Sequence, residues 1–156
     1  MKFQVSAKDK KALCKQAPEF REVVRRIELD GFECNGDLFH ALVQSIISQQ
    51  LSIKAADTIY NRVEQLLGTI TAENLKSAAV EDLRACGLSA RKIEYLRGIA
   101  DAVLSGRINF DALARLPDEE IMKELVKLKG VGEWTAEMLL IFALGRPDVL
   151  SFKDLG

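Results

Sequence analysis

The stretch Leu128-Lys-Gly-Val-Gly-Glu-Trp-Thr-Ala136 decides the fold, because Gly130 and Gly132 separate two segments with helical apolar spacing. Glycine permits a positive φ and a close approach of another backbone. The N–H groups that open a helix at Glu133 have no acceptor within that helix, so they suit an anion such as a phosphate. The stretch therefore predicts a hairpin of two helices over about 121–144. Two glycines alone are equally compatible with a plain turn in a helical core.

The rest of the chain predicts an all-α fold, because apolar residues recur at helical spacing and strict alternation is almost absent. Asp37 is expected to open a helix that reaches about Gln50, and Ser52 to cap a helix that ends at Gly68. Further helices are expected over Glu81–Cys86, from Ser89, over Asn109–Leu116 and from Asp118. The pattern indicates about eight to ten short helices. Phe3–Val5 alone has strand character, and no partner strand is identified.

Composition limits the kind of protein. The 156 residues are 48% hydrophobic, which suits a single domain over 1–156 with a buried core. No apolar run approaches the roughly 18 residues that a membrane helix needs, and no signal peptide follows Met1. We expect a soluble intracellular protein of the cytoplasm or nucleoid. Cys14, Cys34 and Cys86 lack metal-ligand spacing and are expected to stay reduced.

Charge gives only a local indication of a nucleic-acid partner. The net charge of −1 provides no overall basic field. Arg91, Lys92 and Arg97, with Arg62, form a candidate basic patch, although solvated helix faces are favoured for most of these charges. His40 is the only histidine, and a surface or packing role is favoured over catalysis because no partner constellation accompanies it.

Several ordered segments resemble the HhH-GPD superfamily of helix-hairpin-helix DNA glycosylases of base-excision repair, and specifically the 3-methyladenine DNA glycosylase II branch. The resemblance rests on Ser45–Ser52, Cys86–Ser89 with Lys92 and Tyr95, Trp134–Leu140, Leu144–Val149 and Asp154–Gly156. It implies a multi-helix, two-lobed bundle with a cleft. Relatives continue for several helices beyond the position of Asp154, so the resemblance implies that this C-terminal part is missing from the sequence.

Position 134 refines what the resemblance implies about the reaction. Members that also cleave the DNA strand carry a lysine two residues after the second hairpin glycine, and its amine forms a Schiff base. Here that residue is Trp134, which cannot act as this nucleophile. The four-cysteine cluster of the iron–sulfur members is also absent from the sequence. The implied enzyme is a monofunctional glycosylase without lyase activity.

Asp154 occupies the position of the family's catalytic aspartate. Hydrolysis of an N-glycosidic bond builds positive charge on the sugar, which a carboxylate stabilises. Without the resemblance, a solvated loop or a helix cap explains Asp154 better. Asp148 is the competing carboxylate, and its setting in Arg146-Pro147-Asp148 favours a turn. Many relatives carry another acid just before the aspartate, where this chain has Lys153, so the charge role is assigned to Asp154 alone.

The resemblance also implies how a damaged base is extruded and recognised. Gln50 or Leu51 is expected to be the wedge that fills the gap in the base stack. For Leu51 a core contact is an equal alternative, and for Gln50 a hydrogen bond at the helix end. An alkylated purine is cationic and attracts an aromatic face, so Trp134 is the leading base-pocket candidate, with Phe39 and Met138 behind it. Core packing is the alternative for Trp134.

In the hairpin, Gly130, Val131, Gly132, Trp134 and Thr135 are expected to hold a DNA backbone phosphate. The family often places a monovalent cation on hairpin carbonyls, here those of Leu128 and Gly130. No other cofactor and no side-chain metal site is expected.

The sequence therefore predicts a monomeric hydrolase that removes alkylated purines of the 3-methyladenine type from double-stranded DNA. One alternative is a non-catalytic helix-hairpin-helix module that only binds DNA. Another is a glycosylase with lyase activity, which Trp134 argues against.

Overall fold

The structure, a computed structural model, describes residues 2–28, 31–152 and 154, and these residues are mostly helical. The α-helices are α1 (Ala7–Gln16), α2 (Arg21–Arg26), α3 (Leu38–Ser48), α4 (Ile53–Leu67), α5 (Ala72–Ser77), α6 (Val80–Ala85), α7 (Ala90–Leu104), α8 (Phe110–Leu113), α9 (Asp118–Leu125) and α10 (Glu133–Met138). A 3-10 turn, η1 (Pro18–Phe20), and a π-helical turn, η2 (Leu139–Ala143), complete the helical elements. The predicted all-α class is confirmed.

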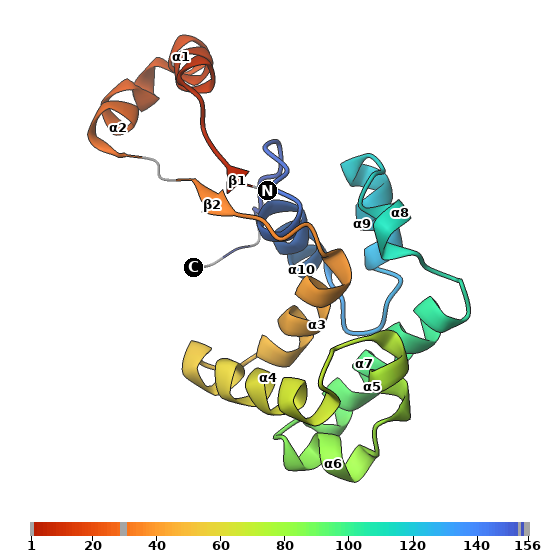
Figure 1. The fold of residues 1–156 in the computed structure, drawn as a ribbon. Coiled ribbons are helices and arrows are strands. Elements are labelled where there is room, and N and C mark those ends of the chain that lie inside the picture. The colour runs from red at the N-terminus through yellow and green to blue at the C-terminus, as the bar shows by residue number, and fades with distance from the viewer. Residues whose placement is uncertain (1, 29–30, 153, 155–156) are drawn as a thin grey trace.

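The helices form two lobes. Figure 1 shows α4, α5, α6 and α7 at one end and α8, α9 and α10 beside them, with α3 running between the two groups. One hydrophobic core extends through both lobes, and it includes Ile46 and Ile47 of α3, Leu96 of α7 and Leu140 of the hairpin. Because α3 contributes to the core of each lobe, the two lobes are held in one arrangement.

Several helix starts lie where the sequence predicted them. The side chains of Asp37, Ser52, Ser89 and Asn109 each accept a hydrogen bond from a backbone N–H in the first turn of their helix. Such a bond satisfies one of the N–H groups that a helix start leaves without an acceptor. The α3 helix ends at Ser48, before the predicted end near Gln50, because the backbone turns at Gln49 with a ψ of 128°.

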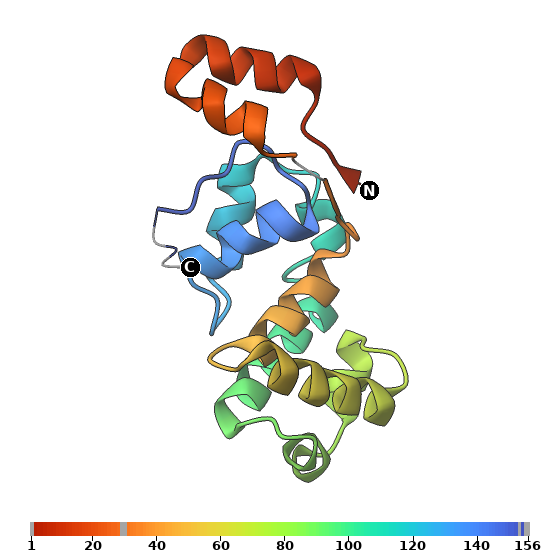
Figure 2. The same ribbon diagram turned by 90° about the vertical axis from the view of Figure 1, so that its left-hand side faces the viewer.

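The N-terminal residues contain two helices that the sequence analysis did not predict. Figures 1 and 2 place α1 and α2 together at one end of the molecule, away from α4–α6. Neither helix has a buried residue. We call residues 6–27 the N-terminal arm. A capping box in which Ser6 and Asp9 bond each other's backbone N–H was the available sequence signal for α1.

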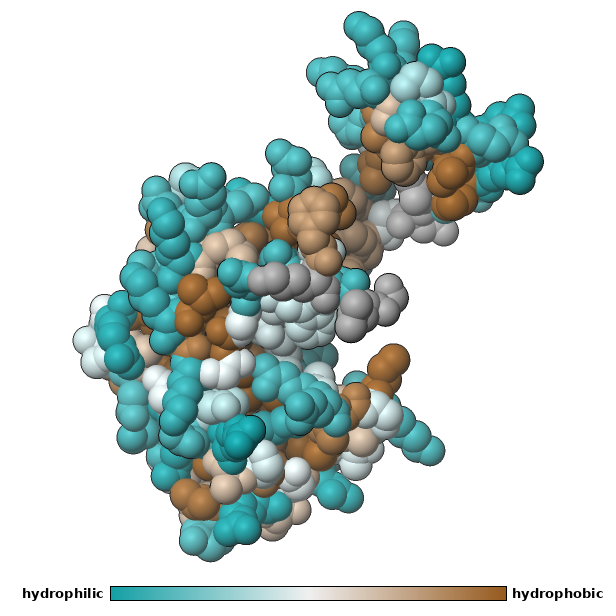
Figure 3. Space-filling model, turned by 180° about the vertical axis from the view of Figure 1, so that it is seen from behind, coloured by the Kyte–Doolittle hydropathy of each residue, from teal (hydrophilic) through white to brown (hydrophobic). Residues whose placement is uncertain are grey.

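A short antiparallel sheet connects the arm to the body. Strand β1 (Lys2–Phe3) pairs with β2 (Phe32–Glu33), and the Phe3 and Phe32 rings stack at 5.0 Å. The partner of the Phe3 strand, which the sequence left open, is thus the segment just before α3. In the space-filling view of Figure 3 the arm is a separate mass, largely covered by hydrophilic side chains.

The second hairpin helix is α10 followed directly by η2. Two hydrogen bonds attach the end of this helix to other segments. The N–H of Gly36, just before α3, donates to Ala143 O at 3.1 Å, and Arg146 Nη2, just after the helix, donates to the carbonyl of Ala114, just after α8, at 2.9 Å. The predicted hairpin over about 121–144 corresponds to α9, the turn after it, α10 and η2. Within the described residues, no helix combines the length and apolar character that crossing a membrane requires.

Candidate functional site

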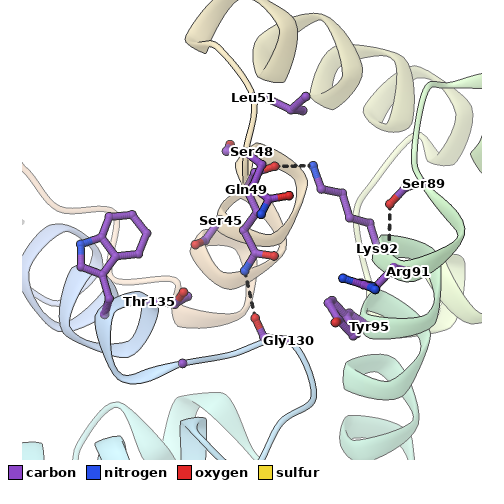
Figure 4. A pocket seen from close by; sticks show the side chains of 13 residues that line it. Ser45, Ser48, Gln49, Leu51, Ser89, Arg91, Lys92, Tyr95, Gly130 and Thr135 are labelled. Atoms are coloured by element: carbon purple, nitrogen blue, oxygen red, sulfur yellow. Dashed lines mark hydrogen bonds between the residues drawn. The ribbon is translucent and has the colours of Figure 1, made fainter. Parts of the chain in front are cut away.

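A groove of about 880 Å³ opens where the α3–α4 loop, α7 and the hairpin turn meet. Figure 4 shows side chains of all three elements facing it. Its charged lining residues are Arg91 and Lys92, and no acidic side chain is among the described residues that line it. The groove is lined by Ser45, Ser48, Gln49, Gln50, Leu51, Ser89, Arg91, Lys92, Tyr95, Gly130, Gly132, Trp134 and Thr135. Such a lining favours an anionic ligand.

The hairpin turn needs glycine at position 130. Gly130 has a φ of +91°, which side chains of L-residues disfavour. Gly132 is the N-cap of α10 in extended backbone with a φ of −97°. Val131 between them is buried, and its N–H donates to Leu128 O at 3.1 Å. The Val131 N–H therefore closes the turn and is not available to a phosphate. The N–H groups at the start of α10 remain as the donors for an anion.

The predicted hairpin residues after the turn also face the groove. Trp134 is 43% exposed and lines it, while Thr135 lines it from a largely buried position. Both residues lie in the first turn of α10, where backbone N–H groups have no acceptor within the helix. Trp134 is therefore a surface residue of the groove rather than a core residue.

The two wedge candidates, in the loop between α3 and α4, also line the groove. Gln50 is exposed and is the one non-glycine residue with positive φ, +58°, among the described residues. Leu51 is 38% exposed, so it is not a core residue. A strained backbone conformation persists only where its surroundings enforce it, and it is often found at functional sites.

Of the four residues in the candidate basic patch, only Arg91 combines exposure with a place in the groove. Lys92 Nζ donates to the carbonyl oxygens of Ile47 and Gln49, at 2.6 and 2.8 Å. Burial lowers the pKa of Lys92 from its ordinary value. Arg97 donates to the Ala78 carbonyl at 2.5 Å, so it too serves the fold. A continuous patch of free cations is therefore not formed by these residues.

A second hollow of about 370 Å³ adjoins the groove, since Ser45 and Ser48 line both. Met138, Phe142 and the carboxylate-bearing Glu33 also line this hollow. Of the three predicted base-pocket residues, the structure therefore places Trp134 in the groove and Met138 in the hollow beside it. Phe39 instead packs against Phe110, with ring centroids 5.6 Å apart, and is not among the described residues lining either space.

Asp154 is exposed and is not among the described residues that line the groove. The segment leading to it is attached to α10, because Ser151 Oγ donates to Glu137 Oε2 at 2.5 Å. Asp148, the competing carboxylate, lies exposed in a turn, as its sequence setting predicts. The neighbouring Lys153 lies outside the described residues.

The hairpin carbonyls are compatible with the expected cation. Leu128 O accepts from Val131 N–H at 3.1 Å, and Gly130 O accepts from Gln49 Nε2 at 2.9 Å. A carbonyl oxygen has two lone pairs, so each retains one for a ligand. Among the described residues, no group of three or more His, Cys, Asp or Glu side chains lies close enough to hold a metal ion. The described cysteines are free thiols.

The sequence analysis gave no site role to Gln49 or Tyr95, although both line the groove and contact Gly130. Gln49 lies beside the wedge candidates, and Tyr95 falls one helical turn after Arg91. This spacing places Tyr95 and Arg91 on the same face of α7. The four-residue spacing was the available sequence signal that Arg91 and Tyr95 both face the groove.

Comparison with known proteins matches this architecture to a family. The model of the HhH-GPD superfamily base excision DNA repair protein matches residues 43–156. DNA-3-methyladenine glycosylase 1 of Schizosaccharomyces pombe is 43% identical over 121 residues, which are 75% of this chain and 53% of that protein. The chain spans about half the length of the curated relatives it matches.

Solved structures agree over almost the whole chain. A crystal structure of DNA-3-methyladenine glycosidase from Bacillus halodurans is 39% identical with a TM-score of 0.87, and the match covers 100% of this chain and 73% of that one. The 3-methyladenine DNA glycosylase of S. pombe in complex with abasic DNA is 35% identical with a TM-score of 0.78. That match covers 96% of this chain and 76% of the S. pombe chain.

Proposed function

Because the chain belongs to the HhH-GPD superfamily of base excision DNA repair proteins, we propose that it is a monofunctional DNA glycosylase. Its substrates are alkylated purines, 3-methyladenine above all, in double-stranded DNA. The observation that carries this proposal is the groove itself. It brings the hairpin turn, the exposed indole of Trp134 and the strained loop at Gln50 onto one surface without an acidic side chain among the described lining residues.

The first turn of α10 and Arg91 hold the DNA backbone. Backbone N–H groups of Trp134 and Thr135 donate to a phosphate, and the exposed guanidinium of Arg91 adds a charge across the groove. Such contacts fix the position of the duplex without reading its sequence. A monovalent cation held by the carbonyls of Leu128 and Gly130 would add positive potential at the same place. The protein acts on DNA as a monomer.

The loop between α3 and α4 replaces the extruded nucleotide. Taking a base out of the stack costs a few kcal/mol, and this cost is lower for a damaged pair. Gln50, which is exposed at a positive φ, enters the gap, with Leu51 beside it against the neighbouring bases. The extruded base passes Ser45 and Ser48 into the hollow lined by Met138, Phe142 and Glu33.

Selectivity for alkylated purines comes from their charge. The exposed face of Trp134 attracts a cationic base by a cation–π interaction of about 0.5–2 kcal/mol. An uncharged, undamaged purine lacks this attraction. Trp134 also supports hydrolysis without strand cleavage, because an indole cannot form a Schiff base with the sugar.

Asp154 stabilises the reacting sugar. The bond between the base nitrogen and C1′ breaks with its electron pair leaving on the base, water adds its oxygen to C1′, and one proton passes to solvent. An abasic site remains. A unit charge at about 4 Å in an effective dielectric of about 20 stabilises the cationic sugar by roughly 4 kcal/mol. This corresponds to about a thousandfold in rate.

The test measures abasic-site formation on methylated duplex DNA by the wild-type chain, Asp154→Asn and the control Asp148→Asn. We expect Asp154→Asn to lose about a thousandfold in rate while it still binds DNA, and Asp148→Asn to match the wild type. Normal turnover by Asp154→Asn would contradict the mechanism. DNA binding without base release by the wild type would favour a non-catalytic DNA-binding module, and trapping of a covalent adduct by borohydride would favour a lyase.

A further inference from the structure

Two long-range side-chain contacts hold the loop between α3 and α4, in addition to a local backbone bond from Leu51 N–H to Ser48 O at 3.1 Å. The side-chain amide of Gln49 donates to Gly130 O at 2.9 Å, across 81 residues of sequence. From α7, Lys92 Nζ donates to the carbonyl oxygens of Ile47 and Gln49 at 2.6 and 2.8 Å. Figure 4 shows Gln49 between Lys92 on one side and Gly130 on the other.

The Lys92 contact serves carbonyl groups that the end of α3 leaves without a backbone donor. The last carbonyls of a helix have no intrahelical donor, and a lysine ammonium is a charge-assisted donor to them. Lys92 is half-buried and bonds both oxygens at once. These bonds fix the backbone on either side of Ser48, directly before Gln50 adopts its φ of +58°. A backbone in this region needs such support from its surroundings.

Both DNA-contacting elements of the proposed function are therefore connected through one side chain. The backbone of Gln49 is bonded to Lys92, and its amide is bonded to the hairpin turn. In a duplex, the spacing between the gap left by an extruded nucleotide and the nearby phosphate is set by the DNA. A wedge and a phosphate grip on the protein work together only if their separation matches it.

We propose that Gln49 and Lys92 are positioning residues that set the separation between the wedge loop and the phosphate-binding hairpin, an inference that rests on the proposed function. Neither residue acts on the reacting atoms. Without them, the wedge loop and the phosphate-binding hairpin can each still contact DNA, but the distance between them no longer matches the duplex. A misplacement of about 1 Å in a catalytic arrangement can cost about a hundredfold in rate.

This role separates two kinds of substrate. Release of a lesion from a fully paired duplex requires the wedge to fill a gap in the stack. Release of the same lesion from a single strand requires no such gap to be filled. A variant that misplaces the wedge is therefore impaired on the duplex and nearly normal on the single strand, whereas a variant with a damaged active site or a damaged fold is impaired on both.

The experiment uses Gln49→Leu, which keeps the side-chain size but removes the donor to Gly130 O. Gln65→Leu makes the same change on the exposed side of α4 and is the matched control. We measure single-turnover base release from paired and single-stranded DNA, affinity for undamaged duplex, and melting temperature. For Gln49→Leu we expect a loss of about tenfold or more on paired DNA and less than about threefold on the single strand. Affinity for undamaged duplex should stay unchanged.

Lys92→Met removes the ammonium from the carbonyls of Ile47 and Gln49 and should show the same selective loss on paired DNA. If Lys92→Met does not fold, the result for Gln49→Leu decides the test. Equal losses on the two substrates, or no loss on paired DNA, would overturn the inference. A second readout follows base extrusion directly by the fluorescence of 2-aminopurine placed beside the lesion. The wild type should raise this fluorescence on binding, and Gln49→Leu should raise it much less.

The fluorescence readout also separates this inference from the proposed function. If the wild type releases no base from either substrate, the proposed glycosylase activity is wrong, and fluorescence alone decides the positioning role. A rise with the wild type that Gln49→Leu lacks supports that role. An equal rise with both chains, or no rise with the wild type, overturns it.

Discussion

The ring of Tyr95 lies against the α-carbon of Gly130, where a β-carbon would overlap Tyr95 Cδ2. The contact joins α7 to the hairpin turn, and both residues line the groove. Gly130 is thus required twice, once for its positive φ and once for the space that Tyr95 fills. Gly132, two residues later, has neither constraint, since a β-carbon there would meet no heavy atom within 4 Å.

The two hairpin glycines should therefore respond differently to alanine. Gly130→Ala should lower the free energy of unfolding by about 2–5 kcal/mol, because a left-handed backbone penalty of about 1–2 kcal/mol adds to an overpacking cost of about 1–3 kcal/mol. Gly132→Ala should change it by less than about 1 kcal/mol. Urea unfolding of both variants checks the difference. A similar loss from both would mean that Tyr95 does not restrict position 130.

Trp134 should matter for cationic lesions and much less for neutral ones. Trp134→Leu removes the aromatic face but keeps an apolar side chain, so kcat/KM should fall about tenfold for 3-methyladenine, within the range of a cation–π interaction. For the neutral lesion hypoxanthine the change should stay within about threefold. Trp134→Phe, which keeps a weaker aromatic face, should lie between. An equal loss on both lesions would assign Trp134 to packing.

Glu33 should contribute to the same preference from the hollow beside the groove. Glu33 lines that hollow together with Met138 and Phe142, and an apolar wall strengthens the attraction of a carboxylate for a cationic base. Glu33→Gln keeps the shape and removes the charge. We expect about a tenfold loss of kcat/KM for 7-methylguanine and little change for hypoxanthine. Glu28→Gln is a control charge change on the N-terminal arm side of the sheet, and it should leave both rates unaltered.

Alkaline pH should weaken the contact between α3 and α4. The Tyr60 hydroxyl hydrogen bonds to His40 Nε2, and burial, with smaller contributions from Glu64 and Asp37, raises the pKa of Tyr60 above its ordinary value of 10.0. The unfolded chain therefore loses this proton first, and the free energy of unfolding falls as pH rises from about 10 through the folded pKa. Urea unfolding from pH 8 to 11 should show this decline, and Tyr60→Phe should show a smaller one. Parallel curves for the two chains would exclude Tyr60 as its source.

The local part of this structure could be predicted from the sequence. Asp37, Ser52 and Ser89 cap helices as expected, and Asn109 caps the short helix expected to begin there, because a cap depends on residues within one turn. The family resemblance gave Trp134 as a base-pocket candidate. The structure places Trp134 in the lining of the groove, and its role toward a base stays a prediction. Periodicity and caps describe single helices, and here they described most of them correctly.

The long-range contacts could not be predicted in this way. The bond from Gln49 to Gly130 and those from Lys92 to α3 connect residues far apart in sequence, and a backbone carbonyl leaves no signature in the side-chain pattern. Lys92 was therefore interpreted as part of a surface patch, although its ammonium serves the fold. Similarly, the partner of the Phe3 strand lies beyond two helices that the sequence analysis missed.

The N-terminal arm has a consequence for how the chain opens in solution. Its helices bury no residue, and Leu13, Phe20, Val23 and Ile27 are each at least 41% exposed. Little free energy therefore opposes separate unraveling of the arm while α3 to α10 stay intact. Amide protons of α1 and α2 should exchange with deuterium through this subglobal opening, far ahead of those in α3 and α7. In a denaturant titration the two lobes would then unfold together at one midpoint, and the arm would already be unfolded at lower denaturant concentrations.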